Sequence, residues 1–205
     1  MSDLVSISLP PPSRKGGMSL SEAIAKRRSA RDFTPEPISR SQLSQILWAT
    51  QGISDTLGER RTVPSAGGTY PLEIFAACGN TSVEKISAGV YRYDPSSHSL
   101  TLQHEGDVRL ELSQAALDQE YVYQAPLDIV ICATSERTAR SYGARGERYI
   151  YVEVGHAGQN LYLQATALGL ATVAIGAFYD ERVREVLRLD KQCQPIYIMP
   201  VGRPA

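Results

Sequence analysis

Hydrophobic and polar positions recur along the chain with two periods, one typical of helices and one typical of strands. Apolar residues have helical spacing over residues 20–28, 39–52, 108–117, 147–168 and 180–187. Short apolar runs predict strands over residues 72–78, 89–93, 100–103, 127–133, 171–175 and 195–201. The run at 127–133 is apolar throughout, which is typical of a central strand. Because helices and strands mix without strict alternation, the pattern favours an α+β fold over a doubly wound sheet.

Two of the predicted helices begin with a capping box, a pair of side chains that bonds the free amides of the first turn. These are Ser19-Leu20-Ser21-Glu22 and Ser39-Arg40-Ser41-Gln42. The first helix carries an apolar stripe, formed by Leu20, Ala23 and Ile24. The second is expected to end at Gly52.

The longest helical pattern covers residues 147–168, is apolar on most faces and is followed by Gly169. A helix that is apolar all round is expected to be buried, here against a second copy of the chain. His156, within this helix, is then interpreted as a core or interface residue and not as a catalytic one.

Composition agrees with one folded domain. The chain has 205 residues, of which 42% are hydrophobic and 21% charged, enough for one substantial core and too few for two large domains. We expect an extended N-terminal arm over residues 1–18, marked by Pro10-Pro11-Pro12, and a single domain over residues 19–205.

Charge and cysteine content narrow the classes of partner. A net charge of -1 argues against nucleic acid or an acidic membrane as the main partner. No apolar run approaches the roughly 20 residues that cross a bilayer, and the N-terminus lacks the apolar core of a signal peptide, so a cytoplasmic location is expected. Cys78, Cys132 and Cys193 are odd in number and far apart, which indicates buried reduced thiols and no metal site.

The densest candidate chemistry lies at the end of the first helix, in Arg27-Arg28-Ser29-Ala30-Arg31. Guanidinium forks and a serine hydroxyl are donors suited to a phosphate and to ring carbonyls. Taken alone, such a segment is more often a solvated last turn that the helix dipole favours. A second donor-rich block is Pro64-Ser65-Ala66-Gly67-Gly68-Thr69-Tyr70-Pro71, in which most side chains are small and two residues are glycine. Taken alone, this block could also be a plain turn. The two segments together predict a flat, polar, phosphorylated cofactor.

In these segments and several others the chain resembles the FMN-dependent nitroreductase family, and within it the SagB/ThcOx-type dehydrogenase branch. The similarity extends in order from about Ser19 to Arg203. Besides the two donor segments, it includes Gly89-Val90-Tyr91-Arg92-Tyr93, Glu153-Val154-Gly155-His156-Ala157-Gly158-Gln159-Asn160, Gly169-Leu170 and Pro200-Val201-Gly202-Arg203-Pro204. The resemblance implies a central, mostly antiparallel sheet flanked by helices, in an intertwined homodimer with FMN bound between the subunits.

The resemblance also implies roles for individual residues. The cofactor-binding candidates are Arg27, Arg28, Ser29, Arg31, Pro64, Ser65, Ala66, Gly67, Gly68, Ile175, Gly176, Ala177 and Arg203. Arg27 and Ser29 are expected at the FMN phosphate, and Arg31 at the N1 and C2-carbonyl edge of the ring, where a guanidinium favours the reduced anion. The block 64–68 is expected to come from the other subunit, and backbone amides of 175–177 are expected at the N5 edge.

Two departures from the family pattern limit what the resemblance implies. Other nitroreductases continue into a C-terminal tail with basic residues, and Arg203 is the candidate for part of that role. Azoline dehydrogenases tend to carry Lys-Tyr where this chain has Ser141-Tyr142. The serine counts against azole formation, whereas Tyr142 is a candidate proton donor to a reduced substrate.

The leading function is therefore an FMN-dependent oxidoreductase, in which NAD(P)H reduces the flavin and a small organic acceptor, such as a nitroaromatic or a quinone, reoxidises it. A single open flavin face would give ping-pong kinetics. The alternatives are an azoline (thiazoline or oxazoline) dehydrogenase of a modified-peptide pathway and a non-catalytic flavin-binding protein. No sequence feature distinguishes NADH from NADPH or identifies the acceptor.

Overall fold

The computed structural model describes residues 6–55, 57 and 60–205. Within that part of the chain one sheet contains seven strands in the order β1-β4-β3-β2-β5-β7-β6, and every pair of neighbours is antiparallel. The strands are β1 (Ser6–Ser8), β2 (Leu72–Cys78), β3 (Gly89–Asp94), β4 (Ser99–Glu105), β5 (Leu127–Thr134), β6 (Ala171–Thr172) and β7 (Cys193–Gly202). The predicted central antiparallel sheet of an α+β fold is confirmed.

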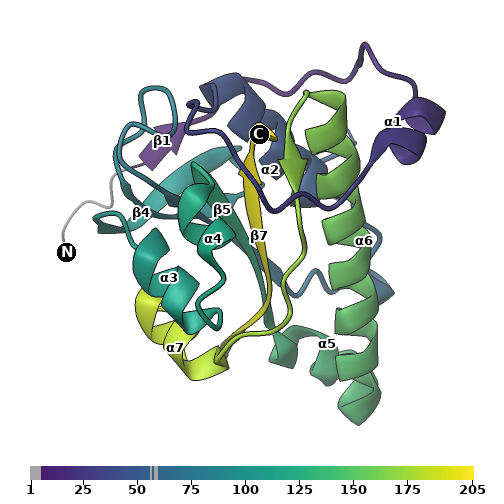
Figure 1. Cartoon of the computed structure of the whole chain (residues 1–205). Coiled ribbons are helices and arrows are strands. Elements are labelled where there is room, and N and C mark those ends of the chain that lie inside the picture. Colours follow the sequence, from purple (N-terminus) through teal and green to yellow (C-terminus); the bar gives the residue numbers. More distant parts are fainter. Residues whose placement is uncertain (1–5, 56, 58–59) are drawn as a thin grey trace.

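Helices cover both faces of this sheet (Figure 1). The α-helices are α1 (Leu20–Lys26), α2 (Arg40–Gln51), α3 (Arg109–Ala115), α4 (Glu120–Gln124), α5 (Ser135–Tyr142), α6 (Gly146–Ala167) and α7 (Asp180–Leu187). Two short 3-10 helices are η1 (Ala66–Gly68) and η2 (Gly143–Arg145).

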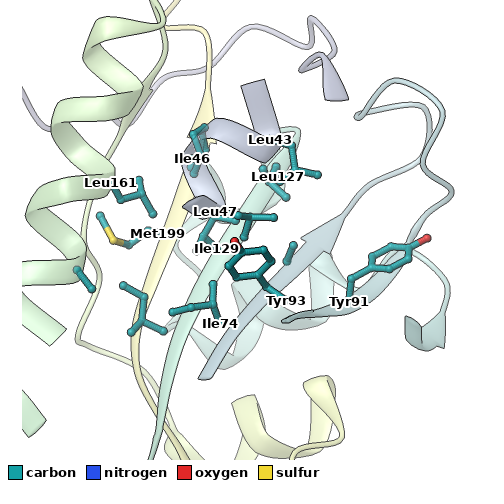
Figure 2. Close-up of a cluster of buried hydrophobic side chains, with 14 of the residues drawn as sticks. Leu43, Ile46, Leu47, Ile74, Tyr91, Tyr93, Leu127, Ile129, Leu161 and Met199 are labelled. Atoms are coloured by element: carbon teal, nitrogen blue, oxygen red, sulfur yellow. The ribbon is translucent and has the colours of Figure 1, made fainter. Parts of the chain in front are cut away.

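The sheet separates two hydrophobic cores. Side chains alternate along β2, so that Leu72 and Ile74 enter the core under α2 and α6, whereas Phe75 and Ala77 enter the core with α3 and α7. Figure 2 shows the first core, in which side chains of α2 and α6 meet those of β2, β3, β5 and β7. Strand β5 lies between β2 and β7 with nearly every residue buried, which confirms the prediction of a central strand.

Some predicted elements have different bounds, and three were missed. The run predicted as a strand over residues 171–175 is paired as a strand only at Ala171–Thr172, and Ile175 forms an isolated bridge with Ile198. Strand β1 and helices α4 and α5 were not predicted, because each is short and carries few apolar residues at regular spacing.

The helix starts agree with their capping motifs, but the stripe on α1 is not buried. In α2, Ser39 and Gln42 form the complete reciprocal capping box. In α1, Ser19 accepts a hydrogen bond from the Glu22 amide, yet Leu20 and Ile24 are 67% and 54% exposed and only Ala23 is buried. Figure 1 shows the reason, since α1 lies at the edge of the molecule beyond α6.

Helix α6 is buried on one face only in the single chain. Val154, Ala157 and Leu161 pack in the first core, whereas Val152 and His156 on the opposite face are exposed. The expectation that the helix is buried all round therefore fails for one chain taken alone. The three cysteines are free and buried, which confirms their prediction as reduced thiols. None of the helices in the described part of the chain is both long enough and apolar enough to span a bilayer.

Candidate functional site

The first donor segment is an extended strip that continues from α1 along the edge of the sheet. The amide of Ala30 donates to the carbonyl of Thr172 in β6, at 3.1 Å. The Ser29 hydroxyl lies 3.0 Å from the Tyr162 hydroxyl on α6, and Tyr162 in turn accepts a hydrogen bond of 2.8 Å from the Ala174 amide. The Arg27 guanidinium lies over the Tyr162 ring, 5.1 Å from its centroid. Tyr162 therefore holds this segment against the sheet.

The other arginines of this region differ in what they contact. Arg31 is exposed, with its guanidinium 6.0 Å from the centroid of the Tyr121 ring. Arg28 donates to two carbonyls at the end of α1, those of Ala25 and of its neighbour in sequence, and so serves as a C-terminal cap. Arg203 lies beside the same strip but pairs with Glu36, at 2.8 Å between Nε and Oε2. Arg31 is thus open to a ligand, whereas Arg28 and Arg203 already have protein partners.

The segment 175–177 follows β6, whose Thr172 pairs with Ser29 of the arginine strip. Ile175 is buried and exchanges both backbone hydrogen bonds with Ile198, at 2.9 and 3.0 Å. Gly176 and Ala177 are exposed, and among the described residues their amides have no acceptor. The amides of Gly176 and Ala177 are therefore free to donate hydrogen bonds to the edge of a flat ring. The Ile175 amide is not, because it already donates to Ile198.

The second donor block is a tight turn that leads into β2. Gly67 and Gly68 have φ angles of 59° and 65°, a left-handed conformation that favours glycine. The Ser65 hydroxyl accepts a hydrogen bond of 2.9 Å from the Tyr70 amide, which fixes the turn. A Cβ atom placed on Gly68 would meet no atom of the described residues within 4 Å, so the backbone there is open to an approaching molecule.

Tyr142, the candidate proton donor, lies against this block. A Cβ atom on Gly67 would come within 2.7 Å of the Tyr142 hydroxyl, so the hydroxyl sits directly over the turn. The Tyr142 ring packs edge-on against Tyr149 of α6, with the ring centroids 4.9 Å apart. Its neighbour Ser141 is exposed.

A buried carboxyl lies beneath the same block. Glu153 of α6 is only 3% exposed, and burial raises its pKa. The nearby side chains of Ser65 and Gln51, together with the positive charge of Arg61, offset part of that rise. One carboxyl oxygen, Oε1, has no hydrogen-bond partner in the described part of the chain.

The two groups of candidates contact α6 at different heights. Ser29 contacts α6 at Tyr162, and Ser65 lies by Glu153, nine positions earlier in the helix. At 1.5 Å rise per residue, this separation is about 14 Å along the helix axis. The fold brings Arg27 and Ser29 together at Tyr162, and residues 64–68 together with Tyr142. Gly176 lies apart from both, in a cavity that Glu147 and Tyr151 of α6 also line.

The free donors of both regions fit a flavin mononucleotide chemically. Arg27 and Arg31 contact aromatic rings but have no carboxylate partner among the described residues. A phosphate would supply the missing anion, and the open amides at Gly176 and Ala177 suit the polar edge of a flat ring. Gly68 allows close approach to the backbone, whereas Gly67 is covered by the Tyr142 hydroxyl.

Comparison with known proteins gives the family. The profile of the Nitroreductase family matches residues 24–203. The protein "Putative nitroreductase MJ1384" of Methanocaldococcus jannaschii is 44% identical over 203 residues, which cover 99% of this chain and 98% of that protein. The chain therefore belongs to the nitroreductase family.

Solved structures agree with this assignment. A crystal structure described as a putative nitroreductase from Ralstonia eutropha has a TM-score of 0.85 at 32% identity, covering 98% of this chain and 90% of that one. The microcin synthetase McbBCD complex of Escherichia coli contains a chain with a TM-score of 0.79 at 25% identity, covering 100% of this chain and 79% of that one. The nitroreductase-like fold inferred from the sequence motifs is thus confirmed.

Several residues that shape the site were missed by sequence reasoning. Tyr162 and Tyr121 carry the arginines, and Glu153 and Arg61 lie under the glycine turn. No local pattern distinguishes these residues, because their roles come from contacts between segments far apart in sequence. Only Glu153 gave a hint, as a carboxylate on the apolar face of the long helix.

Proposed function

We propose that this chain is an FMN-dependent oxidoreductase that uses NAD(P)H to reduce a small organic acceptor such as a nitroaromatic or a quinone. The observation that carries the proposal is a set of polar donors without protein acceptors. In the described part of this nitroreductase fold, Arg27 and Arg31 have no carboxylate partner, and the amides of Gly176 and Ala177 have no acceptor. When bound, FMN supplies the hydride chemistry that links the nicotinamide to the acceptor.

In this proposal the residues of the chain bind and orient the cofactor. Arg27 and Ser29 hold the phosphate, and Arg31 faces the N1 and C2-carbonyl edge, where its charge stabilises the reduced ring. Residues 64–68 and Tyr142 come from the second subunit of a homodimer and cover the ring. Tyr142 holds a proton at its hydroxyl, within reach of an acceptor seated over the glycine turn.

We further propose a cytoplasmic location for this enzyme. Three free, buried cysteines are typical of a reducing environment, and so support the proposal of a cytoplasmic enzyme.

The absorption spectrum of the purified protein tests the cofactor assignment. We expect a yellow protein whose flavin bands bleach when NADH or NADPH is added without oxygen, and parallel lines in steady-state plots with both substrates varied. A colourless protein that does not take up added FMN would overturn the proposal, and intersecting lines would remove the shared ping-pong site.

Replacement of Arg31 tests the residue assignment. Arg31→Ala should weaken FMN binding about tenfold, equivalent to ~1.4 kcal/mol, because a charge-assisted contact is lost. Arg182→Ala is the matched control, since Arg182 is also exposed and lies over a tyrosine ring, that of Tyr179 at 4.8 Å. Equal flavin affinity in the two variants would contradict the role of Arg31.

One observation favours a second function, azoline dehydrogenation. The Escherichia coli microcin B17-processing protein McbC is 30% identical over 136 residues, which cover 65% of this chain and 50% of that protein. Tyr142 is positioned over the turn, but Ser141 stands where azoline dehydrogenases tend to have lysine. Conversion of a thiazoline-containing peptide by the FMN-loaded protein would establish this alternative, and failure of Ser141→Lys to raise that conversion would count against it.

A further inference from the structure

A second polar cavity lies between β2, β3, α2 and α5, beside the glycine turn but distinct from the donors around Tyr162. Its volume is about 440 Å³, and the charged and amide side chains that line it are those of Gln51, Arg61, Glu73, Arg92, Asp94 and Arg137. Cavities of this size hold small organic ligands. Three guanidiniums against two carboxylates leave the lining with one positive charge.

Four of these charged groups are already satisfied within the chain. Glu73 is 8% exposed and binds Arg92 at 2.8 Å through one carboxylate oxygen and Arg137 through the other. Asp94 accepts hydrogen bonds from Ser96 and Ser97 in the turn that follows β3. These contacts hold the side chains of the cavity wall in place. They leave one guanidinium of the lining without a partner.

Arg61 is that remaining arginine. Its guanidinium lies 4.9 Å from the centroid of the Tyr70 ring, and it makes no hydrogen bond or ion pair with any residue that the structure describes. Burial lowers its pKa, with Glu73 opposing the shift, as expected for a charge that is only partly compensated.

The backbone of Arg61 is nevertheless held firmly. It pairs with Ile53 in a β-bridge, and its carbonyl accepts a hydrogen bond of 3.0 Å from the Ser54 hydroxyl. A fixed backbone with an unpaired fork is the arrangement of a preorganised anion site.

Gln51, the last residue of α2, lines the same cavity. It is 1% exposed and lies near the buried Glu153 carboxyl, yet neither its amide nitrogen nor its amide oxygen has a partner in hydrogen-bond geometry among the described residues. Leaving a buried polar group without a hydrogen bond is unfavourable, so a buried glutamine with two such atoms is expected to serve a bound molecule.

We propose that this cavity binds a small organic monoanion, whose carboxylate is held by the Arg61 fork and whose neighbouring polar group meets the Gln51 amide. A monoanion matches the single surplus charge, and a carboxylate matches the planar fork. The proposal does not depend on FMN, because none of the residues assigned to the cofactor lines this cavity.

Calorimetric titration of the purified chain with benzoate tests the proposal, and benzamide serves as the neutral isostere. We expect benzoate to bind and benzamide to fail. Arg61→Met should weaken benzoate binding at least tenfold, whereas Arg182→Met should leave it unchanged, since Arg182 lies over Tyr179 at a similar 4.8 Å on an exposed helix. Excess FMN should not displace benzoate.

Two further variants test the same proposal if Arg61→Met fails to fold. Arg61→Lys retains the charge but loses the fork, and should weaken binding to an intermediate degree. Gln51→Leu should weaken benzoate binding several-fold while raising the melting temperature, because it removes unpaired amide atoms; a glutamine with a purely structural role would lower it. In the amide NMR spectrum, the Gln51 side-chain resonances should shift on addition of benzoate.

Several results would overturn the proposal. Absence of benzoate binding to the folded protein would do so, as would equal competition by inorganic phosphate or displacement by FMN. Loss of binding in Arg182→Met would also place the ligand elsewhere. None of these measurements requires turnover. Benzoate binding can therefore be absent in a protein that binds FMN, or present in one that does not, so the two proposals are tested separately.

Discussion

Asp128 is a fully buried acid in the middle of the sheet. It lies on β5, it is 0% exposed, and neither carboxyl oxygen has a hydrogen-bond partner in the described chain. Burial raises its pKa well above the usual range, with the charge of Arg109 opposing the shift. The proton is therefore held more tightly in the folded protein than in the unfolded chain, and the stability that it contributes is lost as pH rises through the folded-state pKa.

Asp128→Asn should remove this dependence on pH. From about pH 4 upward, the wild-type free energy of unfolding should fall relative to that of the variant, by about 1.4 kcal/mol for each unit by which the pKa is raised. Urea denaturation at pH 5, 7 and 9 measures the difference. The nearby Cys78 thiol does not interfere, because burial raises its pKa to about 12. A difference between variant and wild type that is constant over this range would contradict the argument.

Gly67 gives a second test at the scale of one residue. Gly67→Ala forces a side chain into a left-handed conformation with φ of 59°, which costs about 1–2 kcal/mol, and places a Cβ 2.7 Å from the Tyr142 hydroxyl. Gly17→Ala is the control, because its added Cβ would have no atom within 4 Å in the part of the chain that the structure describes. Urea denaturation should show the loss only for Gly67.

The contact with Tyr142 can be separated from the backbone strain. In a Tyr142→Ala background, the loss caused by Gly67→Ala should shrink to the strain alone. Identical losses in the two backgrounds would mean that the tyrosine simply moves aside, which its 36% exposure permits.

At the scale of elements, the N-terminal caps of α1 and α2 are expected to contribute differently to the free energy of unfolding. Ser39 heads α2, which buries Leu43, Ile46 and Leu47 in the first core, so Ser39→Ala should cost about 1 kcal/mol of global stability. Ser19 makes a similar cap on α1, but that helix buries only Ala23. Ser19→Ala should therefore change the urea midpoint much less, and equal losses would show that α1 unfolds together with the core.

The same contrast explains which elements could be predicted from the sequence. Strand β5 and helix α2 carry long apolar runs or stripes, because they face a core, and their positions agree with the pattern. Helix α5 buries only Thr138 and has a polar sequence, so hydrophobic spacing could not reveal it. Strand β1 has three residues and depends on pairing with β4.

The candidate site divides in the same way. The arginine strip and the glycine turn were recognisable because their residue types are unusual within short segments. Their supports were not, since Tyr162 acts on Ser29 from 133 positions away. The cavity at Arg61 likewise combines residues of five separate elements, α2, β2, β3, β4 and α5, and no short stretch of sequence contains it. Local chemistry could be predicted, whereas the tertiary contacts that orient it could not.

At the scale of the whole molecule, the exposed face of α6 points to a second copy of the chain. Val152 is 52% exposed on a helix whose other face forms the core. Helix α1, whose Leu20 and Ile24 are also exposed, lies beside α6 (Figure 1). A groove of about 570 Å³, lined by residues such as Trp48 and Leu163, lies between α1, α2 and α6. Burial of this apolar surface is the expected driving force for the proposed homodimer.

A charge on this face should separate the subunits. Val152→Asp should convert a dimer to a monomer in light scattering after gel filtration, because a carboxylate would be desolvated in the interface. Leu110→Asp is the matched control, since Leu110 is 49% exposed on α3, at the other face of the sheet, and should leave the dimer intact.

Flavin retention should follow the oligomeric state. If residues 64–68 of one subunit cover the cofactor held by Arg27 and Arg31 of the other, the Val152→Asp monomer should lose FMN on gel filtration while Leu110→Asp retains it. The arginine strip and the glycine turn contact α6 about 14 Å apart. Within one chain, the flavin ring can therefore contact only one of these two segments. A Val152→Asp monomer that holds FMN as tightly as the wild type would show that one chain suffices, and the shared site would have to be abandoned.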